Sequence, residues 1–188
     1  MLGALIDRNG VPPMWRRPPG FATLTRLILE QQVSLASAAA AFRRLEEAVG
    51  TVAPELFLAL DDDRLRAIGF SRQKTGYVRG LAEGLVDGSI DLAAVGELDD
   101  GEATAALTAI RGVGDWTAAC YLLFALRRPD AWPTGDRALH VAMSDALGLG
   151  DVPGSDEAAD RAEAWRPHRA VAARVLWHAY LRERGFAD

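Results

Sequence analysis

A tight turn with two glycines and a single carboxylate downstream of it are the residues whose types and spacing suggest chemistry in this sequence. Gly112 and Gly114 flank one apolar residue, and residues 107–119 predict a helix, a hairpin and a second helix. Glycine allows a close turn, and the N–H groups at a helix N-terminus attract anions. Asp136 follows a Pro-Thr-Gly turn further along the chain. The spacing predicts a hairpin that holds a phosphate by its main chain and a carboxylate that acts on the molecule carrying that phosphate.

Helices must position these residues, because the rest of the sequence is typical of an all-α protein. Alanine is abundant, and β-branched residues are scattered rather than grouped, which favours helices over strands. Capping residues such as Ser34, Asp61, Ser71 and Asp99 mark expected helix starts, and glycines mark expected ends. The prolines of residues 1–20 predict an irregular segment. The expected helices cover residues 21–31, 34–49, 61–69, 71–86, 99 to the hairpin, 115–128, 136–147, 155–165 and 168–184.

The length and composition allow a substantial buried core. The chain has 188 residues, of which 49% are hydrophobic, enough for one domain or two small ones in close association. We expect an all-α fold of two small helical domains, with a helix-hairpin-helix motif at the seam and the active-site cleft between them. Residues 20–128 form the first expected domain, and residues 129–188 together with residues 1–19 form the second.

Charge and cysteine content restrict the class of protein. The net charge of −5 argues mildly against a nucleic-acid partner, but the acidic residues gather in residues 87–102 and 151–163, so another face can be basic. Cys120 is the only cysteine, which excludes an internal disulfide and a cysteine-ligated iron–sulfur cluster. The apolar runs are too short for a membrane span or a signal peptide. We therefore expect a monomer in the cytoplasm, without a membrane partner.

Four segments in a fixed order carry a resemblance to a known family. They are residues 21–34, residues 65–74, the hairpin with Asp136, and residues 165–177. The set resembles the helix-hairpin-helix DNA glycosylase superfamily, and within it 3-methyladenine DNA glycosylase II. The resemblance covers nearly the whole chain and implies a base excision repair enzyme that acts on double-stranded DNA containing damaged bases.

The resemblance also implies roles for single residues. The catalytic aspartate of the family matches Asp136, and a wedge that fills the place of a flipped base matches Gln31 and Gln32. The walls of the base pocket match Trp116 and Trp177, with Cys120 where a relative has a tyrosine. The implied contacts to the DNA backbone are Arg111, Gly112, Val113, Gly114 and Arg137. The implied ligands of a monovalent cation, Na⁺ or K⁺, are the backbone carbonyls of Thr108, Ile110 and Val113, and no other cofactor is implied.

These residue types suit the cleavage of an N-glycosidic bond. A fixed carboxylate such as Asp136 stabilises the oxocarbenium charge on the sugar and orients the attacking water. Tryptophan faces attract cations by roughly 0.5–2 kcal/mol, which favours cationic alkylated purines such as 3-methyladenine, 7-methylguanine and 1-methyladenine. Relatives that also cut the strand use a lysine where this chain has Trp116, and Lys74 is the only lysine. We expect a monofunctional hydrolase that flips the damaged base out of the duplex.

Other interpretations remain open from the sequence. The protein is alternatively a glycosylase for oxidised or deaminated bases, a non-catalytic module that binds damaged DNA, or a helical protein whose glycine turn is only a loop. Asp136 is alternatively only the N-cap of the following helix. The paired glutamines can be a polar helix end, and the tryptophans can be ordinary core residues.

Overall fold

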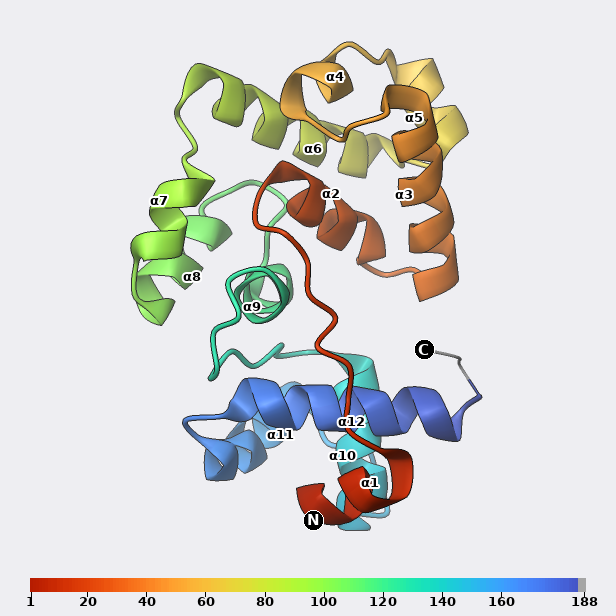
Figure 1. Ribbon diagram of the computed structural model, residues 1–188, viewed down its shortest axis with the longest axis vertical. Helices are drawn as coiled ribbons and strands as arrows, with labels where there is room; N and C mark the ends of the chain where they lie inside the picture. The colour runs from red at the N-terminus through yellow and green to blue at the C-terminus, as the bar shows by residue number, and fades with distance from the viewer. Residues whose placement is uncertain (186–188) are drawn as a thin grey trace. The chain divides into compact units, whose positions relative to one another are not determined.

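The computed structural model describes residues 1–185, and all the regular elements in this range are helices (Figure 1). The expected all-α fold is confirmed. The helices are α1 (Leu2–Asn9), α2 (Phe21–Glu30), α3 (Leu35–Val49), α4 (Pro54–Leu58), α5 (Asp62–Ile68), α6 (Arg72–Asp87), α7 (Leu92–Glu97), α8 (Asp100–Thr108), α9 (Asp115–Phe124), α10 (Arg137–Leu147), α11 (Ser155–Ala162), the short 3-10 helix η1 (Glu163–Trp165) and α12 (Arg169–Glu183).

The chain divides into two compact units. The central unit comprises Arg17–Tyr121, and the terminal unit comprises Met1–Arg16 together with the chain from Leu122 onward. The sequence analysis placed the divisions slightly later, after residues 19 and 128. The candidate hairpin belongs to the central unit, and Asp136 belongs to the terminal unit.

Helix α2 lies at the centre of the core of the central unit, where it packs against α3 and α6 (Figure 1). Its apolar residues recur at the spacing of one helix face, and Leu24, Leu27 and Ile28 are fully buried. Burial of such side chains contributes roughly 1.5–3 kcal/mol each. Phe57, on α4, closes this core through edge-to-face contact with Phe21. The core therefore holds α2 rigidly where it ends at Glu30.

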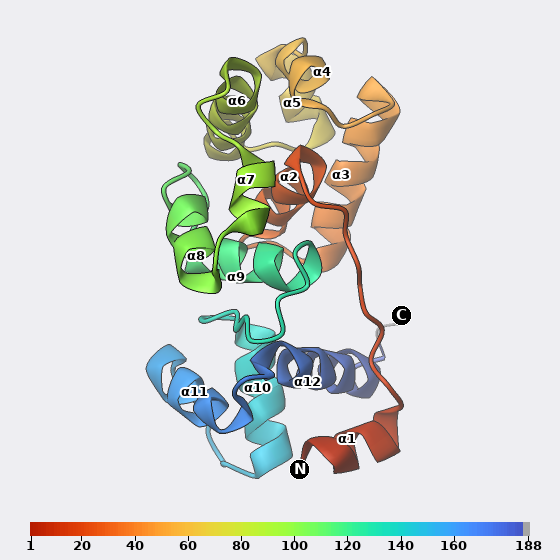
Figure 2. The ribbon, with the colours of Figure 1, turned by 60° about the vertical axis from the view of Figure 1, so that its left-hand side comes forward.

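Helix α12 has the corresponding place in the terminal unit, where it packs against α1 and α10 (Figure 2). Leu176 of α12 is fully buried, as are Leu139 and Met143 of α10. These two helices carry Trp177 and, at the N-terminus of α10, Asp136. The core thus places the aromatic and the acidic candidate residues on neighbouring helices of one unit.

The predicted helix starts are confirmed by their side-chain caps. Ser34, Asp61 and Ser71 each accept a hydrogen bond from the backbone N–H three residues later. Asp99 forms a capping box with Glu102. These caps depend only on neighbouring residues, so the sequence alone is enough to locate them.

Three helices were not expected. Residues 2–9 form α1 instead of an irregular segment, because Leu5 is buried and the helix packs on α12. Helices α4 and α7 span five and six residues, too few for a clear helical period. Packing on other helices, not local propensity, stabilises such short elements.

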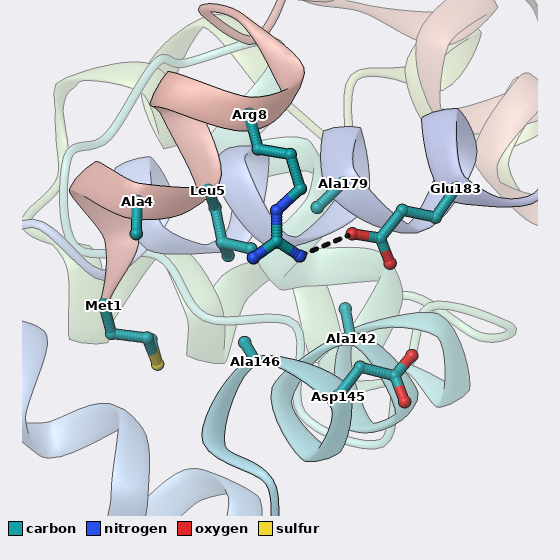
Figure 3. A pocket seen from close by; sticks show the side chains of 9 residues that line it. All are labelled: Met1, Ala4, Leu5, Arg8, Ala142, Asp145, Ala146, Ala179 and Glu183. Atoms are coloured by element: carbon teal, nitrogen blue, oxygen red, sulfur yellow. Dashed lines mark ion pairs between the residues drawn. The ribbon is translucent and has the colours of Figure 1, made fainter.

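A small pocket of about 140 Å³ lies where α1 meets α10 and α12 (Figure 3). Arg8 and Glu183 point toward each other across it, with 3.7 Å between Nη1 and Oε1. Neither Asp136 nor Trp177 lines this pocket. Its lining residues are Met1, Ala4, Leu5, Arg8, Ala142, Asp145, Ala146, Ala179 and Glu183. Within residues 1–185, no helix has both the length and the apolar character that crossing a bilayer requires.

Candidate active site

The expected helix-hairpin-helix is present in the chain. Helix α8 ends at Thr108, and α9 begins at Asp115. Between them the N–H of Val113 donates to the carbonyl of Ile110 at 3.0 Å, which closes the turn. Val113 is buried, whereas Gly114 is exposed at the start of α9. The hairpin therefore anchors itself by an apolar side chain and presents its main chain at a helix N-terminus, as an anion site requires.

Gly112 is needed in this hairpin for two reasons. Its φ of +91° lies in the left-handed region, which favours glycine. A Cβ at this position would also lie 2.2 Å from Cγ of Tyr77, so the backbone approaches the tyrosine ring closely. The guanidinium of Arg111 lies 5.9 Å from the centre of the same ring. Tyr77 of α6 thus supports the hairpin, a role that the sequence analysis did not predict.

The two glutamines proposed as a wedge have different environments. Gln31 directs its side-chain amide to the hairpin, where Nε2 donates to the carbonyl of Gly112 and to Oγ1 of Thr117, both at 2.9 Å. Gln32 is exposed and has a φ of +55°. The bonded amide of Gln31 links α2 to the hairpin, so of the two residues only Gln32 is exposed.

Asp136 is the N-cap of α10, as the alternative interpretation expected. Its Oδ1 accepts a hydrogen bond from the N–H of Leu139 at 2.9 Å and another from Nε1 of Trp177 at 3.1 Å. Two donors and the helix N-terminus complement the negative charge of the carboxylate. Helix capping requires only the hydrogen bond from the backbone N–H of Leu139. The additional hydrogen bond from the indole of Trp177 further fixes the orientation of the carboxylate.

Trp177 presents a half-buried ring beside this carboxylate. It stacks on Phe124, with 5.4 Å between the ring centres and 19° between the planes. Phe124 is the last residue of α9, and the sequence analysis did not select it. Stacked aromatic rings with a nearby carboxylate are suited to bind a flat, electron-poor group.

The other predicted pocket residues lie in the central unit. Trp116, the second residue of α9, is half-buried, and Cys120 is completely buried. The structure therefore brings Asp136, Trp177 and Phe124 together within the terminal unit. It places Gln31 against the hairpin within the central unit.

His140 is a further titratable group close to Asp136. It lies one turn later on α10 and is buried. Burial lowers the pKa of His140, and the Asp136 carboxylate opposes this change, as does a hydrogen bond to the backbone of Pro153, while Arg137 adds to it. The imidazole is therefore neutral at pH 7. The sequence analysis did not select His140, because burial of a side chain depends on tertiary packing.

The remaining predicted contacts are exposed groups and main-chain oxygens. Arg111 and Arg137 are exposed. The carbonyl of Ile110 already accepts the N–H of Val113, but a carbonyl oxygen has two lone pairs and can also bind a cation. A monovalent cation bound by the carbonyls of Thr108, Ile110 and Val113 stays a prediction. No group of three or more His, Cys, Asp or Glu in residues 1–185 is placed to hold a metal ion.

The helix-hairpin-helix and the capped aspartate define a class of DNA-repair fold, and comparison with known proteins identifies it. The sequence profile of the HhH-GPD superfamily of base excision DNA repair proteins matches residues 25–167, and the chain belongs to this superfamily. The expected resemblance is thus confirmed. The Bacillus subtilis protein YfjP is 26% identical over 186 residues, which cover 95% of this chain and 65% of that protein. The chain therefore spans less than two thirds of the length of this relative.

Two solved structures share the fold. A DNA-3-methyladenine glycosidase from Bacillus halodurans is 31% identical, with a TM-score of 0.78 over 98% of this chain and 86% of the other. A 3-methyladenine DNA glycosylase from Schizosaccharomyces pombe, solved in complex with abasic DNA, is 25% identical, with a TM-score of 0.87 over 97% and 90% of the two chains.

Proposed function

We propose that this protein is a monofunctional DNA glycosylase that releases alkylated purines from duplex DNA in base excision repair. The observation that carries the proposal is the carboxylate of Asp136, held by two donors beside the stacked rings of Trp177 and Phe124. The names of the two structural relatives, a DNA-3-methyladenine glycosidase and a 3-methyladenine DNA glycosylase, support the substrate class. The proposed enzyme is a cytoplasmic monomer.

Asp136 acts on the sugar of the flipped nucleotide. As the bond between C1′ and the purine nitrogen breaks, the base leaves with the electron pair, and positive charge develops on the sugar. The carboxylate stabilises this charge and orients a water, whose oxygen bonds to C1′. The released proton of that water passes to the carboxylate and then to solvent. An alkylated purine is cationic and leaves as a neutral base, so no general acid is needed.

The aromatic pair supplies the selection of the base. The face of Trp177 attracts a cationic ring by roughly 0.5–2 kcal/mol. Phe124 stacks on Trp177 and fixes the orientation of the indole. Trp116 and Cys120 remain proposed residues of the base pocket on the strength of the family resemblance alone. A neutral base gains less from this surface, so undamaged purines are disfavoured.

The central unit is proposed to bind the duplex. The main-chain N–H groups at the start of α9 would hold a phosphate, and the exposed Arg111 of the same unit would add charge. The exposed Arg137 of the terminal unit is also proposed to contact the DNA backbone. Flipping a nucleotide costs a few kcal/mol, and the exposed Gln32 would fill the space that the base leaves. A cation on the hairpin carbonyls would supply positive charge near that phosphate.

Strand cleavage through an imine is not part of the proposal. A lysine imine requires an ε-amine at the sugar, and the only lysine of the chain is Lys74. Its ammonium group is bonded to the carbonyls of Leu29 and Gln31. We expect borohydride to trap no covalent adduct between a lysine and DNA.

Base release tests the proposal directly. DNA methylated to contain 3-methyladenine and 7-methylguanine, and a synthetic duplex with 1-methyladenine, are incubated with the protein, and alkali-labile sites are measured. The matched variant is Asp136→Asn, because asparagine also caps a helix. We expect release by the wild type and a loss of about 100-fold or more in the variant.

Three other outcomes would contradict the proposal. If the variant releases bases as fast as the wild type, Asp136 is not the catalytic group. If uracil or oxidised guanine is released faster than every alkylated base, the protein is a glycosylase for deaminated or oxidised bases. Binding of damaged duplex without any release would identify a non-catalytic module.

A further inference from the structure

Lys74 binds main-chain oxygens at the end of a helix. Its Nζ donates to the carbonyl of Leu29 at 2.7 Å and to that of Gln31 at 2.8 Å. These oxygens lie where α2 ends, and the last carbonyls of a helix have no partner within the helix. An ammonium group also complements the negative end of the helix dipole. Burial lowers the pKa of Lys74, which is half-buried.

The backbone that Lys74 holds leads directly into a strained, exposed turn. We define the α2–α3 turn as residues 31–34. Gln32 has a left-handed φ of +55°, a conformation that a side chain rarely adopts unless the surrounding structure imposes it. The apolar Val33 and Leu35 beside it are also exposed, at 47% and 62%. The turn is therefore shaped by its attachments and not by burial of its own side chains.

Gln31 is attached on both sides. Its carbonyl accepts from Lys74, and its side-chain amide donates to Gly112 and Thr117 of the hairpin region. Helix α6 carries both Lys74 and Tyr77, and Tyr77 packs against Gly112. One helix thus supports the hairpin and, through a single ammonium group, the turn that bears Gln32.

We infer that Lys74 is a positioning residue, which fixes the α2–α3 turn against the hairpin so that Gln32 is ready to enter the duplex. The inference rests on the proposed function. According to this inference, the only lysine of the chain binds main-chain carbonyls of the protein and does not bind a DNA phosphate. Two carbonyls converge on one Nζ, a geometry that the compact ammonium group satisfies and the planar fork of arginine does not.

The test separates base extrusion from the chemistry that follows it. Lys74→Met keeps the length of the side chain and removes the donor. Its activity is measured on one alkylated purine in two duplexes, paired normally or placed opposite an abasic site, where extrusion is easier. We expect kcat/KM to fall about 10-fold on the paired duplex and less than about 3-fold on the other. Arg43→Met, which removes an equal charge from an exposed surface pair, should change neither value.

Two further measurements keep the inference testable if Lys74→Met folds poorly. Gln31→Met breaks the other attachment of the same residue, so it should give the same ratio between the two duplexes. Lys74→Gln retains an amide donor on a shorter, neutral side chain, so its ratio between the two duplexes should lie between those of the wild type and Lys74→Met. Where Lys74→Met folds well, combining it with Gln31→Met should cost less than the sum of the two changes, because both remove one linkage.

The possible outcomes distinguish the inference from the proposed function. If the wild type releases no base from either duplex, the proposed function is wrong. If the wild type is active and Lys74→Met loses equal activity on both duplexes, Lys74 does not position the wedge. A decrease of about one in the slope of log(kcat/KM) against log salt would show that Lys74 contacts a phosphate instead, and would overturn the inference.

Discussion

In each of the two units, a basic side chain donates hydrogen bonds to main-chain carbonyls near the C-terminus of a helix. The two interactions stabilise different parts of the candidate site. In the central unit, Lys74 binds the end of α2, next to an exposed turn. In the terminal unit, Arg174 donates to the carbonyl of Leu123 at 2.7 Å, near the end of α9, and is only 6% exposed. Phe124, the next residue, stacks on Trp177. One cation shapes a surface turn, and the other fixes an aromatic pair.

This difference suggests how the proposed work is divided. The proposed DNA contacts of the central unit are exposed main chain and the exposed Arg111 and Gln32, whereas the candidate groups of the terminal unit are side chains held by other side chains. Changes in the central unit should therefore weaken DNA binding, and changes around Asp136 should lower kcat with little effect on KM. Of the four substitutions below, two test this division directly and two test the packing that holds the terminal unit, in order of decreasing expected effect.

The largest effect is expected for Gly112→Ala. The new Cβ would clash with the ring of Tyr77, and the alanine would have to adopt a φ of +91°. Together these two effects cost about 3 kcal/mol of stability. DNA affinity, measured by fluorescence anisotropy, should fall at least about 10-fold. The matched control is Gly76→Ala in α6, where nothing lies within 4 Å of the new Cβ. Wild-type affinity in Gly112→Ala would contradict a hairpin that binds DNA.

Arg174→Met should destabilise the terminal unit by about 1–3 kcal/mol, because the carbonyl of Leu123 would lose a buried donor. The free energy of unfolding in urea measures this loss. Arg161→Met is the control, since it removes only an exposed pair with Glu157, worth less than about 1 kcal/mol. Equal stability of the two variants would show that Arg174 does not hold the end of α9.

Trp177→Phe should lower kcat about 10-fold and leave KM nearly unchanged. Phenylalanine keeps a ring against Phe124 but removes the donor to Asp136, a hydrogen bond to a charged group worth about 1.5–3 kcal/mol. Single-turnover rates at saturating DNA give the effect on chemistry. Trp132→Phe makes the same change in ring size at a buried tryptophan whose Nε1 has no hydrogen-bond partner among residues 1–185, and should not alter kcat. A change confined to KM would contradict a role in orienting Asp136.

The smallest effect is expected from His140, and it depends on pH. Because burial lowers the pKa of His140 in the folded protein, the unfolded chain binds a proton first as the pH falls below about 6.5. This part of the stability is therefore present above pH 6.5 and lost in more acidic solution, by no more than about 1.4 kcal/mol per pH unit. Tm measured between pH 7.5 and 5 should fall less in His140→Gln. Parallel curves for the two proteins would exclude the imidazole as the cause.

Local features of the fold were predictable from the sequence, and long-range contacts were not. Ser34 and Asp99 cap helices where their spacing predicts it, and Gly112 forms the turn for which glycine is needed. Helix α1 was missed because packing on α12 stabilises it.

Contacts between side chains that lie far apart in the sequence were also not predicted. Phe124 and Trp177 stack, and Lys74 reaches Gln31, yet nothing in their spacing indicates that they meet. The amide of Gln31 faces the hairpin for the same reason: tertiary contacts decide which of two adjacent glutamines stays exposed.

Because Lys74 is the only lysine of the chain, its chemical reactivity can report on local opening of the structure around it. An acylating reagent has a single side-chain amine to modify, and that amine is engaged by two carbonyls. Acylation can proceed only when the hydrogen bonds of Lys74 to the two carbonyls break. The acylation rate therefore measures how often the structure around residue 74 opens locally. Peptide mass mapping of the adduct would time this opening without any label or substitution.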